Sequence, residues 1–312
     1  MKHCFGIDLG GTTVKLGLFL ENGEILEKWE IKTRIEDEGK WILPDIAEAI
    51  KGKMEERNLT EQDVIGAGMG VPAPVAADGS VPRAINIGWG YKAVKKELEE
   101  LTGLRVCAGN DANVAALGEY WLGAGKGSKN MLMVTLGTGV GGGIIIEGKC
   151  LNGNHGAGGE FGHMIVNHAE TECCGCGRKG CIEMYASATG IVRLARRRLE
   201  KDNAETSLRE VKELSSKAVF DAVKEGDVVA KEIAEEFGEY LGNALVNLAT
   251  VTDPEVVVIG GGVSKAGEIL LDYVKKPFLK NAYYINMDTK FVLAELGNDA
   301  GICGAAKLVL SE

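Results

Sequence analysis

The sequence has no long apolar run. Across its 312 residues, nothing approaches the roughly 20 consecutive apolar residues that a transmembrane helix requires. The first residues, Met1-Lys-His-Cys, lead directly into a strand pattern, which is not typical of a targeting segment. We therefore expect a cytoplasmic protein, in which thiols stay reduced. Four cysteines are then expected to behave as small hydrophobes: Cys4, Cys107, Cys150 and Cys303.

An excess of basic residues is also missing. Lys and Arg number 35 against 45 Asp and Glu, which gives a net charge of -10 and disfavours a nucleic-acid-binding surface. Hydrophobic residues make up 45% and charged residues 26% of the chain, which is ordinary for a globular protein. The length is sufficient for two domains, each with its own core.

The common nucleotide-binding motifs are absent. The sequence has no Gly-x4-Gly-Lys-Ser/Thr run, and no Gly-x-Gly-x-x-Gly between a strand and a helix with an acidic residue downstream. It has instead a strand at residues 4–8, a glycine turn, and a second strand at 14–20. Turn residues 10–13 present backbone N–H groups and hydroxyls, which suit a phosphate. Asp8 ends the first strand, where it is placed to hold Mg²⁺ through water, and Lys15 follows in the second.

The same arrangement occurs again at residues 131–147. Leu136-Gly137 aligns with Leu9-Gly10, so two similar units lie about 127 residues apart and predict a duplicated architecture. Two such loops are suited to grip a polyphosphate from opposite sides. A third glycine turn, at 260–262, follows an apolar strand and precedes a helix that is expected to start at Lys265.

A cysteine-bearing stretch from Gly158 to Glu183 is rich in glycine and has few residues that favour a regular element. Three of its cysteines and one histidine make a normal tetrahedral set for zinc: His163, Cys174, Cys176 and Cys181. Cys173 is an alternative ligand to Cys174. A buried or disulfide-bonded cysteine cluster is the alternative to a metal site.

The same stretch offers groups for a sugar. A zinc-bound histidine leaves its second ring nitrogen for another group, and Glu160 and Glu183 stand close to the ligands in sequence. We therefore expect the loop to hold the hydroxyls of a polyol. The alternative for both glutamates is solvated surface charge.

Two polar residues outside this stretch are further candidates. Asn86 lies in a glycine-bearing loop before Trp89 and suits a ligand hydroxyl, although a turn-forming Asn fits equally well. Asp111 precedes an alanine-rich helix that is expected to run to about Leu122. The helix dipole there favours an ionised carboxylate, and an ordinary N-cap is the alternative reading.

The chain resembles the ROK family, which comprises bacterial sugar kinases, related repressors and open reading frames, and within it the glucokinases. The resemblance covers essentially the whole chain. It rests on five motifs: Asp8-Leu-Gly-Gly-Thr12, Asn110-Asp111, Leu136-Gly-Thr-Gly139, Gly158-Gly-Glu-Phe-Gly-His163 and Cys174-Gly-Cys-Gly-Arg-Lys-Gly-Cys181-Ile-Glu183.

The resemblance implies the actin-like ATPase fold, a duplicated RNase H-like α/β architecture with two domains flanking a cleft. It implies a smaller domain of residues 1–117 plus 299–312 and a larger one of residues 118–298. The apolar C-terminal residues, expected to be helical from Asp299 to Leu310, would then return to the first domain.

The resemblance also implies phosphorylation of the 6-hydroxyl of glucose, with ATP, Mg²⁺ and a structural Zn²⁺, by a homodimer or homotetramer. It makes Asp111 the general base. The implied sugar ligands are Asn86, Asn110, Asp111, Glu160, His163 and Glu183. The implied zinc ligands are His163, Cys174, Cys176 and Cys181. The nucleotide would meet Asp8, Gly10, Gly11, Thr12, Thr13, Lys15, Gly137, Thr138, Gly139, Gly260, Gly261 and Gly262.

Other functions of the same family are alternatives. One is a kinase for N-acetylglucosamine, N-acetylmannosamine or fructose. Another is a sugar-responsive repressor, which we disfavour because the first phosphate hairpin begins within the first ten residues and leaves no room for a DNA-binding module before it. The phosphoryl donor is also open, since polyphosphate or ADP would use similar loops. Gly70-Val-Pro-Ala-Pro74 departs from relatives that have glycine after the first proline, which affects the expected substrate preference.

Overall fold

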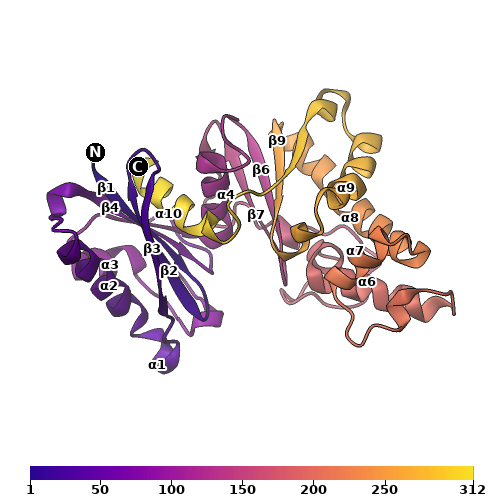
Figure 1. Ribbon diagram of the computed structural model, residues 1–312, viewed down its shortest axis with the longest axis horizontal. Helices are drawn as coiled ribbons and strands as arrows, with labels where there is room; N and C mark the ends of the chain where they lie inside the picture. The colour runs from indigo at the N-terminus through magenta and orange to yellow at the C-terminus, as the bar shows by residue number, and fades with distance from the viewer. Residues whose placement is uncertain (312) are drawn as a thin grey trace. The chain divides into compact units, whose positions relative to one another are not determined.

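Two five-stranded sheets with helices form the fold (Figure 1). The structure is a computed structural model and describes residues 1–311. The first sheet has the order β3-β2-β1-β4-β5, with strands β1 His3–Leu9, β2 Thr13–Leu20, β3 Ile25–Lys32, β4 Val64–Val71 and β5 Val106–Asn110. The second has the order β10-β9-β6-β7-β8, with strands β6 Met131–Leu136, β7 Val140–Ile146, β8 Lys149–Cys150, β9 Val256–Gly260 and β10 Lys290–Leu293.

The two sheets repeat one topology. Read from opposite ends, they give the orders 3-2-1-4-5 and 8-7-6-9-10, so each strand of the second sheet corresponds to the strand five numbers lower in the first. Within the first sheet, β1 pairs with β2 in antiparallel and with β4 in parallel register. The predicted duplication of an α/β unit is thereby confirmed.

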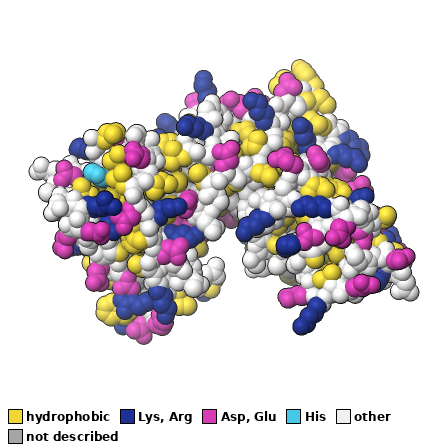
Figure 2. All heavy atoms as spheres, in the orientation of Figure 1, with side chains coloured by type: hydrophobic (Ala, Val, Ile, Leu, Met, Phe, Trp, Pro, Cys, Tyr) yellow, Lys and Arg dark blue, Asp and Glu magenta, His cyan; other side chains and the backbone are white. Residues whose placement is uncertain are grey.

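The helices are α1 Glu36–Gly39, α2 Ile42–Glu56, α3 Val94–Thr102, α4 Asp111–Leu122, α5 Glu183–Ala186, α6 Ala188–Lys201, α7 Ser216–Lys224, α8 Val228–Thr252, α9 Glu268–Asn281 and α10 Ala300–Ser311. The longest helix of the described residues is α8, with 25 residues. None of the helices in the described residues is long and apolar enough to cross a membrane. On the face shown in Figure 2, acidic and basic side chains are interspersed.

The chain divides into two compact units. The first comprises Met1–Gly127, Gly143–Gly159 and residues 295–311, and the second comprises Ser128–Gly142 and Glu160–Ala294. These bounds differ from the predicted domains mainly by the segment Gly143–Gly159, which the sequence had assigned to the larger domain. The segment groups with the first unit because it packs on α4. The Asn113 amide donates to the carbonyl of Gly158 at 3.0 Å, and a Cβ on Gly143 would lie 2.4 Å from that of Ala116.

Two faces of the first sheet carry different cores. On β1, Phe5, Ile7 and Leu9 contribute to a large cluster with α2 and α3, because alternate residues of a strand share a face. Cys4 points to the other face, where α10 packs, and Figure 1 shows α10 on the side of the sheet opposite α2 and α3. On β1 this second face carries the small residues Cys4 and Gly6. A Cβ on Gly6 would lie 2.0 Å from the carbonyl oxygen of Ile302.

A buried carboxylate fastens the end of α4. Glu119 has no exposed surface, and its oxygens accept hydrogen bonds from the backbone amides of Ala124 at 3.0 Å, Glu295 at 3.2 Å and Leu296 at 2.8 Å. It therefore holds the turn that follows α4 against the segment that leads into α10. A buried carboxylate is tolerated there because its oxygens are hydrogen-bonded.

Two helix predictions are wrong in their bounds. The sequence of residues 182–200 predicts one helix, whose basic end at 193–198 is expected to be a solvated face. The structure interrupts this helix at Ser187, whose backbone is extended and whose hydroxyl caps α6 by accepting from the amide of Gly190. The helix expected from Lys265 begins at Glu268, because Gly262–Ala266 forms a 3-10 turn and Gly267 has φ of 88°. Apolar residues at helical spacing predict a core stripe over residues 228–249: Val229, Ile233, Phe237, Leu241, Leu245 and Leu248. In α8 the first five are buried and Leu248 is partly buried.

Candidate active site and metal centre

Four side chains of the second unit converge as a metal site. The ligand atoms of His163, Cys174, Cys176 and Cys181 all lie within 4.8 Å of one another. The Sγ atoms of Cys176 and Cys181 are 3.6 Å apart, and Cys174 Sγ lies 3.8 Å from Nδ1 of His163. A tetrahedral zinc ion places its ligand atoms about 3.5–3.8 Å apart. The donor set and its spacing therefore fit zinc.

All eight cysteines are free thiols in the described residues, so no disulfide joins the cluster there. Cys173 is exposed and lies outside the group of four. It instead forms a backbone bridge with Lys179. Cys4, Cys107 and Cys303 are buried as expected, whereas Cys150 is only partly buried.

Glycine and backbone hydrogen bonds shape the metal loop. The amide of Cys174 donates to the carbonyl of Arg178 at 2.7 Å, which turns the chain back between the ligands. Gly180 has φ of 74°, and a Cβ there would lie 1.9 Å from the carbonyl oxygen of Asn167. No other residue fits this position, so the glycine lets Cys181 approach the other ligands.

One thiol is poised to ionise. Burial raises the pKa of Cys176, but hydrogen bonds from the backbone and side chain of Arg178 and from the neighbouring thiols lower it to about 6. The thiolate is the form that binds a metal. Arg178 is thus a neighbour that favours ligation.

A buried ion cluster anchors the segment before the cysteines. The side chain of Glu170 is 2% exposed, and it pairs with Arg193 at 2.7 Å and Arg197 at 3.1 Å. It also accepts a hydrogen bond of 2.6 Å from the Tyr185 hydroxyl. Since Arg193 and Arg197 lie on α6, the cluster ties the start of the metal loop to the helix that follows it. The basic end of this helix, expected to be a solvated face, is therefore partly a structural clamp.

Glu183 lies between the metal loop and the second glycine loop. Its Oε2 accepts from the amide of Val140 at 3.0 Å, and its Oε1 lies 3.4 Å from Sγ of Cys174. A Cβ on Gly139 would lie 2.2 Å from Oε2. The carboxylate predicted to bind sugar is thus held in place by one oxygen, which leaves Oε1 as the oxygen on the metal side.

The first glycine loop is closed by its own backbone and by Thr33. The amide of Gly10 donates to the carbonyl of Thr13 at 3.0 Å. Thr33, which is 2% exposed, donates its hydroxyl to Gly10 O at 2.7 Å and its amide to Thr12 O at 2.9 Å. These contacts turn the loop carbonyls inward.

Asp8 stands beside this loop and against the start of α10. Burial raises the pKa of Asp8, and the charge of Lys15, its cross-strand partner, opposes that rise. A Cβ on Gly301 would lie 2.5 Å from Cγ of Asp8, so only glycine leaves room for the carboxylate. A carboxylate oxygen in this setting is a suitable ligand for Mg²⁺ or its water.

The second loop is supported in the same way by different residues. The hydroxyl of Thr189 donates to Thr138 O at 2.8 Å, and the amide of Ala188 donates to Gly137 O at 2.8 Å. Each loop therefore has two carbonyls held by a threonine hydroxyl and a backbone amide. In the first loop both donor groups belong to Thr33, the residue after β3. In the second loop they belong to Ala188 and Thr189, at the beginning of α6.

The third loop passes the backbone next to the second. Gly261 has φ of 85°, and a Cβ there would lie 2.5 Å from the carbonyl oxygen of Leu136. Beside it, a cavity of about 140 Å³ is lined by Phe220 and Asp221 of α7 and by Val263 and Lys265. An apolar wall with a few polar groups suits a planar base.

Asp111 is the first residue of α4 and does not serve as its N-cap. The cap is Asn110, whose Oδ1 accepts from the amides of Ala112 at 3.0 Å and Asn113 at 3.2 Å. The Asn110 amide nitrogen lies 3.4 Å from the carbonyl of Ala73. The ordinary N-cap reading of Asp111 is therefore wrong, although its Oδ1 still accepts from the amide of Ala112 at 2.8 Å.

The remaining predicted sugar ligands are exposed. Asn86 lies in a 3-10 turn of the first unit, Ile85–Ile87, and its backbone carbonyl is near Gly11. Glu160 precedes the turn Phe161–His163 of the second unit, and its carbonyl accepts from the amide of His163 at 3.2 Å. The structure thus groups His163 and Glu183 around Cys174 in the second unit. In the first unit it places Asn86 and Gly11 close together, and Asn110 beside Asp111.

Comparison with known proteins connects these features to a family. The family model described as "ROK family" matches residues 4–312. The chain is a member of the ROK family. It is 45% identical over 309 residues to a glucokinase of Halalkalibacterium halodurans, covering 97% of this chain and 94% of the relative.

Two further relatives show the range of the ROK family. A solved ROK glucokinase from Streptomyces griseus, in complex with glucose and AMPPNP, is 36% identical, with a TM-score of 0.77 and coverage of 99% of this chain and 100% of that one. The fold is thereby that of the ROK sugar kinases, the actin-like ATPase fold expected from the sequence. An N-acetylgalactosamine kinase from a Shewanella species is 32% identical over 97% of this chain and 96% of its own length.

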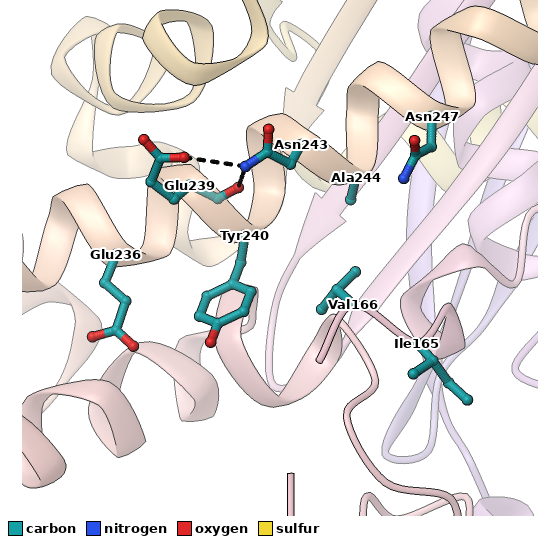
Figure 3. A pocket seen from close by; sticks show the side chains of 8 residues that line it. All are labelled: Ile165, Val166, Glu236, Glu239, Tyr240, Asn243, Ala244 and Asn247. Atoms are coloured by element: carbon teal, nitrogen blue, oxygen red, sulfur yellow. Dashed lines mark hydrogen bonds between the residues drawn. The ribbon is translucent and has the colours of Figure 1, made fainter. Parts of the chain in front are cut away.

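A cavity of this ROK chain lies elsewhere in the second unit. It measures about 440 Å³ and is lined by α8 and by Ile165 and Val166 of the metal loop, with none of the predicted site residues among its walls (Figure 3). Tyr240 points toward the cavity and stacks on Tyr185 with ring centroids 3.9 Å apart. Tyr240 therefore links the cavity wall to Tyr185, which is hydrogen-bonded to Glu170. Because none of the predicted sugar ligands lines it, this cavity is not the predicted sugar site.

Sequence reasoning missed Thr33, Thr189 and Glu170. None of them lies in a recognisable motif, because each acts through a contact with residues far away in the chain. The only available signal was the adjacency of Glu170 and Glu172 to the cysteines.

Proposed function

We propose that this ROK chain is a glucokinase that transfers the γ-phosphoryl group of ATP to the 6-hydroxyl of glucose. The observation that carries the proposal is the full-length similarity to a glucokinase whose solved structure contains glucose and AMPPNP. The glucokinase of Halalkalibacterium halodurans, at 45% identity, supports the same substrate pair.

Asp111 acts as the general base. It accepts the proton of the 6-hydroxyl while the oxygen attacks the γ-phosphorus, the new O–P bond forms, and the bond to the departing ADP breaks. It lies in the first turn of α4, where its Oδ1 accepts from the amide of Ala112 at 2.8 Å. Asn110 keeps that turn in place by capping it.

The glycine loops bind the phosphates. With their carbonyls held by Thr33 in one loop and by Ala188 and Thr189 in the other, the loops offer the amides of Gly11, Thr12, Thr138 and Gly139 to the charge that develops on the γ-phosphoryl oxygens. Mg²⁺, when bound near Asp8, neutralises phosphate charge. The cavity beside Gly262 and Val263 receives the adenine ring.

The metal loop binds the sugar. His163 presents Nδ1 to the sulfur of Cys174, so Nδ1 is the metal ligand and Nε2 is available to a sugar hydroxyl. Glu183 and Glu160 accept from other hydroxyls of the ring. Zinc, when bound, supplies no chemistry to the transfer and fixes these groups in space.

A second candidate substrate is an N-acetylhexosamine. The 32% identity to an N-acetylgalactosamine kinase over nearly the full length favours considering it. The catalytic base and phosphate loops would then be unchanged, and only the walls around the sugar would differ.

A panel of sugars and donors tests the proposal. The value of kcat/KM is measured for glucose, mannose, fructose, N-acetylglucosamine, N-acetylmannosamine and N-acetylgalactosamine, each with ATP, ADP and polyphosphate. The phosphorylated position of the product is assigned by phosphorus NMR. Glucose with ATP should give the highest value and a 6-phosphate. A preference for an N-acetylhexosamine would assign the chain to another ROK kinase, and a lack of transfer to any sugar would overturn the kinase function. Light scattering at working concentration tests the expected homodimer or homotetramer.

A further inference from the structure

The segment after the last metal ligand is bonded to the second phosphate loop at three points. Glu183 accepts from the amide of Val140, the amide of Ala188 donates to Gly137 O, and Thr189 donates its hydroxyl to Thr138 O, at distances of 3.0, 2.8 and 2.8 Å. Gly137 and Thr138 of the loop, and Val140 directly after it, are therefore all hydrogen-bonded to one short stretch of chain. All of these residues belong to the second unit.

The same stretch is held from its other side by the metal loop. Cys181 precedes Glu183 by two residues and is fully buried, and Cys174 Sγ lies 3.4 Å from Oε1 of Glu183. The amide of Ile182 donates to the carbonyl of Met164 at 2.9 Å, next to the ligand His163. Any ion that fixes Cys174, Cys181 and His163 therefore also fixes the position from which Glu183 reaches the phosphate loop.

We propose that the segment from Glu183 to Thr189 couples the metal site to the second phosphate loop, so that the metal supports nucleotide binding and Thr189 is a positioning residue for the phosphates. The inference rests on the proposed function, in which the metal loop was assigned to the sugar. It extends the role of the metal to the second substrate.

The first phosphate loop provides the contrast. Its carbonyls are held by Thr33, which follows β3 and belongs to the first unit. This first loop corresponds to the second loop in the duplicated fold. None of the hydrogen bonds described above as supporting it comes from the segment that follows the metal ligands. The two loops should therefore respond differently when the metal is removed.

Thr189→Val is the first test, because it deletes the hydroxyl and keeps the shape. Thr189 is exposed, so the change leaves the core intact. Loss of one supporting hydrogen bond should raise the Kd of ATP and its KM by about 3- to 10-fold. The KM of glucose and the zinc content should stay unchanged, and Thr189→Ser, which retains the hydroxyl, should restore the affinity for ATP.

Thr250→Val is the matched control. Thr250 is also exposed and donates its hydroxyl to a backbone carbonyl, that of Val246 at 2.8 Å, on α8. Its replacement should leave the Kd of ATP as in the wild type. An unchanged Kd of ATP in Thr189→Val, or an equal rise in Thr250→Val, would overturn the proposed role of Thr189.

Hydrogen exchange tests the coupling without measuring activity. Amide exchange is followed by mass spectrometry in the zinc-loaded chain and after removal of zinc with a chelator. Peptides that contain residues 137–140 should exchange at least about 5-fold faster without the metal, while peptides that contain residues 10–13 should not change. Equal acceleration of both loops, or no acceleration of residues 137–140, would overturn the coupling.

The outcomes separate this inference from the proposed function. If the chain transfers no phosphoryl group to any sugar, the kinase function fails while the exchange experiment still decides whether metal and loop are coupled. If the chain is an active glucokinase and the exchange rate of residues 137–140 does not change when the metal is removed, only the coupling is overturned.

Discussion

Gly304 of α10 and Val114 of α4 meet backbone to backbone: a Cβ on Gly304 would lie 1.6 Å from the carbonyl oxygen of Val114. An alanine in a helix normally stabilises by about 1 kcal/mol over glycine. Here the methyl group would have to push two helices apart. We expect Gly304→Ala to lower the free energy of unfolding by about 3 kcal/mol, measured by urea denaturation.

Gly52→Ala is the control for this effect. Gly52 lies inside α2, and a Cβ there would meet nothing within 4 Å. The substitution should therefore stabilise the chain by about 0.5–1 kcal/mol. If both variants were stabilised, the close packing of α10 against α4 would be wrong.

The Glu170 cluster makes stability depend on pH. Burial by itself raises the pKa of Glu170, but hydrogen bonds from Arg197, Tyr185, the Glu172 amide and Arg193 lower it well below the ordinary value of 4.5. Because the folded-state pKa is lowered, the ionised carboxylate stabilises the fold above pH 4.5, and this contribution is lost as the pH falls toward the folded-state pKa.

Glu170→Gln should therefore be least stable relative to the wild type near neutral pH. We expect a loss of about 3 kcal/mol there, because two arginines lose their buried partner. The difference should shrink below about pH 4.5. Thermal melts of both chains across this range measure it. Glu232→Gln, which removes the exposed partner of Arg198, should change stability by at most about 1 kcal/mol at any pH. A pH-independent loss in Glu170→Gln would contradict the ionised pair.

Much of the fold follows from local patterns. The alternation of Phe5, Ile7 and Leu9 with small residues defines one strand with two different faces, and the repeat of Leu9-Gly10 at Leu136-Gly137 predicts the second sheet. The return of the Gly143–Gly159 segment to α4 follows from no such pattern. It depends on the hydrogen bond between Asn113 and Gly158 and on close packing with Ala116, which only the folded chain shows.

The candidate site was also predicted from the sequence only in part. The four metal ligands lie within one short stretch, so their spacing alone predicted a set that the structure brings within 4.8 Å. Asn110 was assigned to the sugar, and nothing in the sequence separated its capping role from that of Asp111. Thr33 and Thr189 support the two phosphate loops from elements with no sequence similarity, so the duplication that predicts the loops does not predict their supports.

Removal of single cysteines distinguishes ligands from neighbours. Cys176→Ser should lose the bound zinc, because serine is a poor zinc ligand, and should weaken glucose binding by at least about 10-fold through the displacement of His163 and Glu183. Zinc is counted by elemental analysis and glucose binding by calorimetry. Cys173→Ser should retain one zinc per chain, since Cys173 lies outside the cluster. Loss of zinc in Cys173→Ser alone would replace Cys174 with Cys173 in the ligand set.

Asp111→Asn distinguishes a role of Asp111 in catalysis from a role in the stability of the fold. Since Asn110 caps α4, the substitution at Asp111 should leave the midpoint of thermal unfolding unchanged. Glucose should still bind within about 3-fold of the wild-type affinity, while kcat falls by at least about 100-fold because the 6-hydroxyl proton has no acceptor. Calorimetry and steady-state kinetics measure the two quantities.

Asp227→Asn should give the opposite pattern, with a change in stability and none in kcat. Asp227 caps α8 by accepting from the amide of Ala230 at 2.9 Å, and it also accepts from the Thr206 hydroxyl at 2.8 Å. Asn keeps the cap through its Oδ1, but the amide group that replaces Oδ2 cannot accept from the Thr206 hydroxyl, so the change should cost about 1 kcal/mol of stability and leave kcat unchanged. Near-normal kcat in Asp111→Asn would place Asp111 in the same class as Asp227 and remove it from the chemistry.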